Sequence, residues 1–323
     1  MSTAAEQRIL IAGCGAIGSV IGCLLKQAGH DVTLLGRAWH LDAIRRQGLW
    51  VDGIWGEHYA GGFHLADDAS TCTGPYDLIM IAVKSYDTDS MVRQVAPLLK
   101  ADGLALSMQN GLGNIETLAQ AFGPERSLGA SVLVGAEISE AGKARVTVQA
   151  APIVIGPLEV SDCVLMERIH SWIRHFNQAQ IPCETTTRIL SHLWAKVFYN
   201  APLNALGALL QVHYGILGDE LELRLLMDRI IDEAFQIAEK ADVELLWSSA
   251  AEYREFFYNH LLPSTFDHQS SMLQDLKRGR RTEIDALNGW IWRCGETLRI
   301  PTPYNEVVTR LIWQRERIHG LTR

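Results

Sequence analysis

The sequence lacks any uninterrupted apolar run long enough to cross a bilayer, and it contains few cysteines. A membrane-spanning helix needs about 20 consecutive, mostly apolar residues, so no such helix is expected. Only six of the 323 residues are cysteine, and no two of them form a C-x-x-C pair or a metal-binding spacing. This pattern disfavours a disulfide framework or a metal site, and it is typical of reduced, mostly buried thiols in a cytoplasmic protein.

An excess of basic residues is also absent, because 29 lysines and arginines face 37 acidic residues, for a net charge of −8. This balance disfavours nucleic acid or an anionic membrane as a general partner, although a local basic pocket for an anionic cofactor is compatible with it. Residues 1–7 are too short and too polar for a signal peptide, and we find no repeats or low-complexity segments. The length and composition predict a soluble globular protein of about two domains.

Residues 8–37 carry the strongest motif of the chain. The apolar run 9–12 predicts a buried parallel strand. It is followed by Gly13, Gly15 and Gly18 in the spacing G-x-G-x-x-G. Apolar residues then recur at helical spacing, and a second apolar run follows. In this strand–loop–helix–strand context the glycine motif indicates a dinucleotide-binding site.

Each glycine of this loop has a physical role in such a site. Gly13 permits the tight turn, Gly15 lets the backbone approach a pyrophosphate, and Gly18 lets the helix pack on the sheet. The amides at the start of the helix then face the phosphates with the positive end of the helix dipole. The motif alone leaves open a glycine-rich turn that binds nothing. The loop residues that we predict to contact the cofactor are Gly13, Cys14, Gly15, Ala16, Ile17 and Gly18.

The end of the second strand indicates which nucleotide is bound. NAD sites usually have an Asp or Glu there, which accepts hydrogen bonds from the ribose hydroxyls. This chain has Gly36-Arg37 instead, and the nearby acid Asp31 precedes the strand. Because a guanidinium suits a 2′-phosphate, we predict NADP(H) rather than NAD(H). The alternative is that Arg37 is a surface arginine at a helix start.

Two further apolar runs end in polar loops. Residues 77–83 form a predicted buried strand that is followed by Lys84-Ser85, and residues 104–108 are followed by Gln109-Asn110. Open α/β sheets bind ligands at the carboxyl ends of their strands, so both loops are candidates for the site. Around these strands we predict a hairpin or meander over 48–65, antiparallel strands within 127–156, a helix near 162–178 and a strand near 181–186.

From about Arg188 the pattern is helical only, which divides the chain into a nucleotide-binding domain at 1–187 and an all-helical domain at 188–323. The predicted helices occupy residues 191–212, a segment capped by Asp219 with Glu222, a segment from Ser248 or Ser249, residues 270–277, a segment capped by Thr282, and a segment after Thr302-Pro303. An α/β nucleotide domain followed by a helical domain is typical of a reductase whose active site lies between them.

Three places in the helical half have polar residues that packing alone does not require. Lys196, Asn200 and Asn204 are spaced i, i+4, i+8, so an ammonium and two amides share one stripe of an otherwise apolar helix. Ser270-Ser271 stands at a predicted helix N-terminus, where a hydroxyl can bind a carboxylate. Glu283 with Asp285 begins the next predicted helix.

Structural alternatives exist for each of these residues. A lysine in an apolar helix often extends to solvent, and asparagines can bridge helices. Ser271 and Glu283 suit capping positions. The residues alone therefore indicate a nicotinamide-dependent reductase with Lys196 as candidate acid, and they say little about the substrate.

Over nearly its whole length the chain resembles the ketopantoate reductase family, the NADPH-dependent 2-dehydropantoate 2-reductases. The matching segments are GCGAIG at 13–18, VKS at 83–85, QNGLGNIETL at 109–118, LWAKVFYNAPLN at 193–204 and SSMLQDLKRGRRTEIDALNG at 270–289. The last two segments are the most specific. The resemblance implies a Rossmann-type NADP(H)-binding domain followed by a helical domain like the C-terminal domain of 6-phosphogluconate dehydrogenase.

The resemblance also implies roles for individual residues. Lys196 would donate a proton to the ketone oxygen while NADPH delivers hydride, and Ser271 would bind the substrate carboxylate. Glu283 would accept a hydrogen bond from the substrate's 4-hydroxyl. The remaining positions are Asn200 and Asn204 in the substrate pocket, Asn110 near nicotinamide and substrate, and Lys84 near the cofactor. Pro202 departs from the family pattern, and we expect it to affect Asn204 by kinking the helix.

The implied activity is NADPH-dependent reduction of 2-dehydropantoate to (R)-pantoate, a step of pantothenate and coenzyme A biosynthesis in the cytoplasm. Another branched 2-keto acid is the alternative substrate, and a non-catalytic NADP(H)-binding sensor is the alternative from another class. A homodimer through the helical domain is expected only from the family.

Overall fold

The computed structural model describes residues 6–159 and 163–321, which form two compact units. The first unit extends to Ile189 without Gly111–Gly113, and the second comprises those three residues and the chain from Leu190 onwards. Residues 1–5 and the predicted start of a helix at 162 lie outside the described residues. An α/β unit followed by an all-helical unit confirms the predicted fold class.

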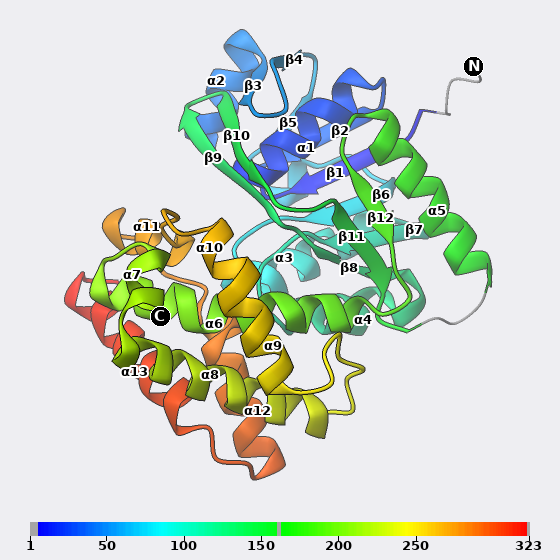
Figure 1. Cartoon of the computed structure of the whole chain (residues 1–323). Coiled ribbons are helices and arrows are strands. Elements are labelled where there is room, and N and C mark those ends of the chain that lie inside the picture. The colour runs from blue at the N-terminus through cyan, green and yellow to red at the C-terminus, as the bar shows by residue number, and fades with distance from the viewer. Residues whose placement is uncertain (1–5, 160–162, 322–323) are drawn as a thin grey trace. The chain divides into compact units, whose positions relative to one another are not determined.

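The first unit contains an eight-stranded sheet of strand order β12-β11-β8-β7-β6-β1-β2-β5 (Figure 1). Neighbouring strands are parallel except β8 and β11. The order reverses between β1 and β6, the place at which such sheets bind ligands beyond their carboxyl ends. The strands are β1 (Arg8–Ala12), β2 (Asp31–Leu35), β5 (His64–Ala66), β6 (Tyr76–Ile81), β7 (Leu99–Ser107), β8 (Ser127–Ser131), β11 (Ile153–Pro157) and β12 (Cys183–Thr185).

Both faces of this sheet are buried, which explains why its strands are continuous apolar runs. Side chains alternate between the faces, so on β1 Ile9 and Ile11 enter one core while Leu10 and Ala12 enter the other. Each of these four side chains has no exposed surface, as predicted for a buried strand. The first core includes α1 (Ala16–Gln27) and α5 (Cys163–Gln178), and the second includes α3 (Thr88–Val95) and α4 (Asn114–Phe122).

A second sheet of four strands has the order β4-β3-β10-β9 and packs on α1. The antiparallel pair β3 (Leu49–Gly53) and β4 (His58–Ala60) confirms the hairpin predicted over 48–65. The antiparallel pair β9 (Val134–Glu140) and β10 (Lys143–Gln149) confirms antiparallel structure within 127–156. The helix α2 (Ala38–Gln47) joins the two sheets in sequence.

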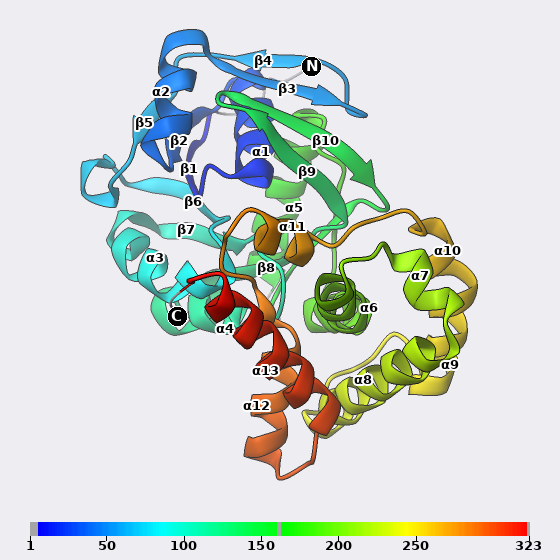
Figure 2. The same cartoon turned by 90° about the vertical axis from the view of Figure 1, so that its left-hand side faces the viewer.

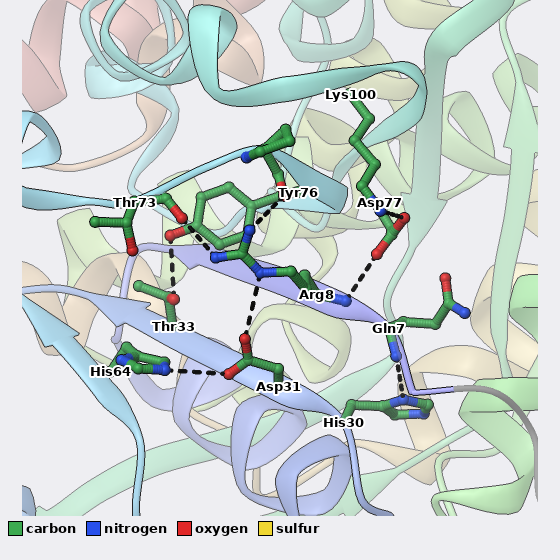
Figure 3. A network of polar contacts seen from close by, with 11 residues as sticks. Gln7, Arg8, His30, Asp31, Thr33, His64, Thr73, Tyr76, Asp77 and Lys100 are labelled. Atoms are coloured by element: carbon green, nitrogen blue, oxygen red, sulfur yellow. Dashed lines mark hydrogen bonds and ion pairs between the residues drawn. The ribbon is translucent and has the colours of Figure 1, made fainter.

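Polar residues at the amino ends of the main strands pair with one another around Arg8 (Figure 3). The Arg8 amide donates to Asp77 (2.8 Å), and its guanidinium donates to the carbonyls of Pro75 (3.1 Å) and Thr73 (2.6 Å). Nε of the same guanidinium donates to Asp31 (3.4 Å). Because these contacts join β1, β2 and β6 at the edge opposite the glycine loop, we interpret them as structural.

The second unit is organised around α6, which Figure 2 shows almost along its axis. Phe198 of α6 stacks on Phe235 of α8, with ring centroids 4.0 Å apart, and it also contacts Tyr253 of α9. A helix that is apolar around most of its circumference belongs in a core, and α6 confirms the helix predicted at 191–212. The helices are α6 (Ile189–Leu210), α7 (Tyr214–Asp219), α8 (Leu221–Lys240), α9 (Ala250–Phe256), α10 (Leu262–Ser264), α11 (Ser271–Lys277), α12 (Asn288–Leu298) and α13 (Pro303–Ile318).

Three predicted caps of this unit are wrong, although the cap at Ser249 is confirmed. Asp219 ends the short helix α7, so α8 begins after Glu220 without a side-chain cap. Thr282 precedes a 3-10 turn rather than a helix, and α12 begins only at Asn288. Pro303 does begin α13, but Thr302 makes no capping bond. Among the described residues, no helix combines the length and apolarity that crossing a bilayer requires.

Candidate functional site

The glycine loop between β1 and α1 has a backbone that other residues could not adopt. Gly13 has φ of +120°, and a Cβ there would lie 2.4 Å from the Val83 nitrogen. A Cβ on Gly18 would lie 2.1 Å from the Gly13 carbonyl oxygen. At Gly15, by contrast, a Cβ would meet no atom within 4 Å. The loop is therefore closed by packing at its two ends and open at Gly15, as close approach of a pyrophosphate requires.

The helix that follows offers its N-terminal end at the same place. Gly15 is the N-cap of α1, which begins at Ala16, and no side chain caps it. No acidic residue lies in the first turn. The first amides of a helix have no partner within the helix, so Ala16, Ile17 and Gly18 suit a phosphate.

Cys14 is buried behind this loop and has a structural environment. Its Sγ lies 3.4 Å from the Ser19 hydroxyl, which lies 3.0 Å from Nε2 of His40. Nδ1 of His40 accepts a hydrogen bond from the Gly142 amide (3.1 Å). Burial raises the pKa of Cys14 to about 11, so its thiol is protonated and poorly reactive at neutral pH. Any contact of Cys14 with a cofactor would thus come from its backbone.

Arg37 lies just beyond the carboxyl end of β2, where it is the N-cap residue of α2. It is exposed, and it forms no ion pair with a described residue. The first turn of α2 contains no acid. The predicted alternative, a surface arginine at a helix start, describes its position correctly. That position nevertheless combines a guanidinium with a helix N-terminus and lacks the carboxylate of an NAD site, so it suits a 2′-phosphate.

The loops after β6 and β7, which carry Lys84 and Asn110, are joined by hydrogen bonds that are buried or partly buried. Nε2 of Gln109 donates to the Val83 carbonyl (2.9 Å) and to Oγ1 of Thr88 (2.7 Å). The Thr88 hydroxyl also lies 2.9 Å from Oδ1 of Asn114, whose Nδ2 donates to the Asn110 carbonyl (3.0 Å). Thr88 and Asn114 were not predicted from the sequence. The only signal for them is their place at the starts of α3 and α4.

In the helical unit, the predicted stripe of α6 is present and the helix continues through Pro202. Lys196 is half-buried, while Asn200 and Asn204 are 9% and 6% exposed. Oδ1 of Asn204 accepts a hydrogen bond from the Tyr214 hydroxyl (2.6 Å), so that side chain has a structural partner. Asn200 makes no hydrogen bond with a described residue. Its amide is therefore open to a ligand, which suits the predicted place of Asn200 in the substrate pocket.

The two serines before α11 differ in their roles. Ser270 is fully buried and is the N-cap, because its Oγ accepts a hydrogen bond from the Leu273 amide (3.0 Å). Ser271 is the first residue of the helix and is exposed. The alternative that Ser271 is only a cap is therefore wrong, because Ser270 is the cap, and the hydroxyl of Ser271 remains available to a substrate.

Glu283 is 7% exposed and makes no capping hydrogen bond, so the alternative that it is only a helix cap is wrong. Its neighbour Asp285 accepts hydrogen bonds from Arg281 (3.0 Å) and from Nε1 of Trp313 (3.0 Å). Of the two predicted acids, Asp285 thus has a structural role. Glu283 instead influences Lys196 of α6.

The charge of Glu283 affects the pKa of Lys196. Burial of Lys196 lowers the pKa of its ammonium, the negative charge of Glu283 raises that pKa, and the result is about 8. Two side chains far apart in sequence thus lie close enough within the second unit for the charge of one to shift the pKa of the other. A lysine with this pKa is largely protonated at neutral pH and loses its proton more easily than an exposed lysine, as a general acid requires.

An open glycine loop at the switch point of a parallel sheet, together with a lysine and a carboxylate in a helical unit, defines the class of dinucleotide-dependent oxidoreductases. Residues 9–159 match the family described as Ketopantoate reductase PanE/ApbA, and residues 188–316 match its C-terminal domain. The chain belongs to the ketopantoate reductase family.

Relatives and solved structures agree with this assignment. The chain is similar to the 2-dehydropantoate 2-reductase of Aquifex aeolicus, with 36% identity over 96% of this chain and 97% of the relative. The corresponding protein of Pyrococcus horikoshii is 31% identical, over 97% and 99%. A PanE/ApbA family ketopantoate reductase from Ralstonia eutropha has a TM-score of 0.84 and 32% identity, over 97% and 99%. A D-mandelate dehydrogenase solved with NADH, 24% identical over 97% and 100% with a TM-score of 0.86, shows likeness of fold alone.

Proposed function

We propose that this protein reduces 2-dehydropantoate to pantoate with NADPH. The observation that carries this proposal is the electrostatic coupling of Lys196 to Glu283, because these residues would supply an acid for the ketone and a carboxylate for a substrate hydroxyl. The names of the full-length relatives support the same substrate. The open position at Gly15 and the unpaired guanidinium of Arg37 fit the pyrophosphate and the 2′-phosphate of NADPH.

When bound, NADPH supplies the hydride that the keto carbon accepts. Lys196 donates its proton to the ketone oxygen, so the carbonyl becomes an alcohol and the lysine becomes a neutral amine that solvent reprotonates. Negative charge grows on that oxygen in the transition state, so the ammonium stabilises the transition state more than the ground state.

The other polar residues bind and orient the substrate. The hydroxyl of Ser271 would donate to the substrate carboxylate, and the amide of Asn200 would contact its oxygens. Glu283 would accept a hydrogen bond from the 4-hydroxyl while it holds Lys196 in the charged form. We assign Asn204 a smaller part, since Tyr214 already occupies its carbonyl. Lys84 and Asn110 would contact the cofactor, and Asn110 the substrate as well.

The test is a spectrophotometric screen of NADPH oxidation against 2-keto acids with and without a second hydroxyl. We expect 2-dehydropantoate to have the highest kcat/KM. A higher kcat/KM for a branched keto acid without the hydroxyl would show that the substrate is different, while the proposed reduction of a 2-keto acid would stand. Absence of turnover with every keto acid would overturn the proposal in favour of an NADP(H) sensor.

We also propose that the protein works in the cytoplasm as a homodimer formed through the helical unit. None of the six cysteines, all of which lie among the described residues, forms a disulfide, which suits a reducing compartment. Exposed apolar side chains on α8 and α13, among them Leu221 (67%), Leu225 (50%), Val307 (54%) and Leu311 (49%), suit an interface. Light scattering would measure the mass, and a monomer at micromolar concentration would contradict the dimer.

A further inference from the structure

The segment Thr282–Asn288, which carries Glu283, is fixed at both ends by side chains of α13. At its start, one carboxylate oxygen of Glu316 accepts hydrogen bonds from the Thr282 amide (2.8 Å) and hydroxyl (2.6 Å). At its end, Nδ2 of Asn288 donates to Oδ1 of Asn305 (3.0 Å). All four side chains have no exposed surface. Buried hydrogen bonds of this kind have no water to replace them, so both anchors are costly to break.

The helix that supplies these anchors is itself fixed to the core of the unit. Glu233 of α8 accepts hydrogen bonds from the amides of Tyr304 and Asn305, both at 2.9 Å, and from Nδ2 of Asn305 (2.7 Å). It thereby caps α13 in place of the predicted Thr302. Asn288 also donates to the Ala201 carbonyl of α6 (3.1 Å), in the helix that carries Lys196. The segment is thus tied both to α13 and to the helix of the lysine.

These contacts set the position of Glu283, whose own side chain makes no capping bond. Asn305 and Glu316 lie eleven residues apart on one continuous helix, so their separation along its axis is about 16 Å and cannot vary without breaking the helix. A carboxylate that must reach both a lysine and a substrate hydroxyl depends on such precision, because a shift of about 1 Å can cost on the order of a hundredfold in rate.

We propose that Glu316 is a positioning residue, and that α13 holds the Glu283 carboxylate at the place from which it acts on Lys196 and on the substrate hydroxyl. This inference rests on the proposed function. Glu316 touches neither substrate nor cofactor in this scheme, and its effect passes through Thr282 to Glu283. Trp313 adds a third contact from α13 to the same segment, through Asp285 (3.0 Å).

The experiment compares Glu316→Ala with Glu316→Gln and with a matched control on α13. Thr309→Ala is the control, because Thr309 is fully buried and its hydroxyl donates only within the helix, to the Asn305 carbonyl (2.7 Å). The readouts are the alkaline limb of kcat/KM and the preference for 2-dehydropantoate over its analogue without the 4-hydroxyl.

We expect Glu316→Ala to reduce this preference at least about tenfold and to move the alkaline limb to lower pH, because Glu283 supports Lys196 less well. Glu316→Gln keeps an oxygen that can accept both Thr282 bonds, so it should recover most of the loss. Thr309→Ala should lower Tm only. If Glu316→Ala does not fold, Thr282→Val removes one of the two bonds and should shift both readouts in the same direction. Unchanged readouts in the folded variants would overturn the proposal, as would equal loss in the alanine and glutamine variants.

A second measurement separates this inference from the proposed function. The rate at which acetic anhydride acylates Lys196, followed against pH by peptide mass spectrometry, requires no substrate. If wild-type protein reduces no keto acid, the proposed function fails, while a lower acylation midpoint in Glu316→Ala would still support the positioning role. An unchanged midpoint would refute the positioning role even in an active enzyme.

Discussion

Burial lowers the pKa of Lys196, the carboxylate of Glu283 raises it, and together they leave it at about 8. Desolvation disfavours the charged ammonium, and a nearby negative charge favours it. In the proposed mechanism the pair would therefore do more than bind a substrate hydroxyl, because the charge of Glu283 favours the protonated lysine at neutral pH.

The first prediction concerns the pH dependence of the reaction. In the proposed mechanism the acid form of Lys196 is the active one. The value of kcat/KM should then be constant well below pH 8 and should fall tenfold per pH unit above an apparent pKa of about 8. Glu283→Gln removes the negative charge that raises the pKa of Lys196, so the alkaline fall in kcat/KM should begin at lower pH. Steady-state profiles of both proteins test this, and an alkaline limb near 10 would show that burial does not tune the lysine.

The second prediction is that Lys196→Ala lowers kcat by about a hundredfold or more, the usual contribution of a general acid. NADPH affinity should change little, because the predicted cofactor contacts lie in the other unit. Single-turnover kinetics and fluorescence titration with NADPH measure the two quantities. A kcat close to that of the wild type would remove Lys196 from the mechanism.

The third prediction separates recognition by Glu283 from general damage. A hydrogen bond to a charged group contributes about 1.5–3 kcal/mol, or roughly tenfold to a hundredfold in kcat/KM. Glu283→Ala should therefore lower kcat/KM for 2-dehydropantoate about tenfold to a hundredfold more than kcat/KM for the analogue without the 4-hydroxyl. An equal loss of kcat/KM for both compounds would contradict recognition of the hydroxyl by Glu283 and would weaken the substrate assignment.

The fourth prediction concerns the choice of cofactor. Arg37→Ala should raise the KM for NADPH about tenfold to a hundredfold and leave that for NADH nearly unchanged, since only NADPH has the 2′-phosphate. Arg46→Ala is the matched control, because Arg46 is an exposed arginine near the other end of α2. A wild-type preference for NADH would contradict the assignment of Arg37.

The fifth prediction concerns stability in acid. Burial and the neighbouring His175, whose ring centroid lies 5.0 Å away, lower the pKa of His30 to about 4. Between pH 6.5 and 4 the unfolded chain binds a proton here that the folded chain does not. The free energy of unfolding should fall by roughly 2–3 kcal/mol as the pH drops through this window and keep its full value above it.

Urea unfolding of wild type and His30→Phe at pH 7 and pH 4.5 measures this effect. The phenylalanine keeps a ring in the core and cannot titrate, so the stability of the variant should depend less on pH. His64→Phe is the control, because the His64 side chain is 66% exposed. Equal pH dependence in wild type and His30→Phe would show that His30 does not titrate in this range.

Sequence alone determined the features that depend on short spacing. Glycines at fixed intervals between an apolar strand and helix specified the nucleotide loop, because only glycine fits the backbone at Gly13 and the contact at Gly18. An interval of four residues placed Lys196 and Asn200 on one stripe of α6, because helical periodicity is local. The buried strands followed for the same reason, since both faces of β1 are covered.

Only the tertiary structure decided which residues far apart in sequence form hydrogen bonds or shift each other's pKa. Thr302 stands at the start of α13, yet Glu233 from another helix caps it, and Thr88 and Asn114 join two loops that the sequence treats separately. Glu283 was a candidate from the resemblance, but its effect on Lys196 depends on burial and on charges brought together by folding. Desolvation and Coulomb interactions depend on distance in space, and that distance exists only once α6, the Thr282–Asn288 segment and α13 have packed.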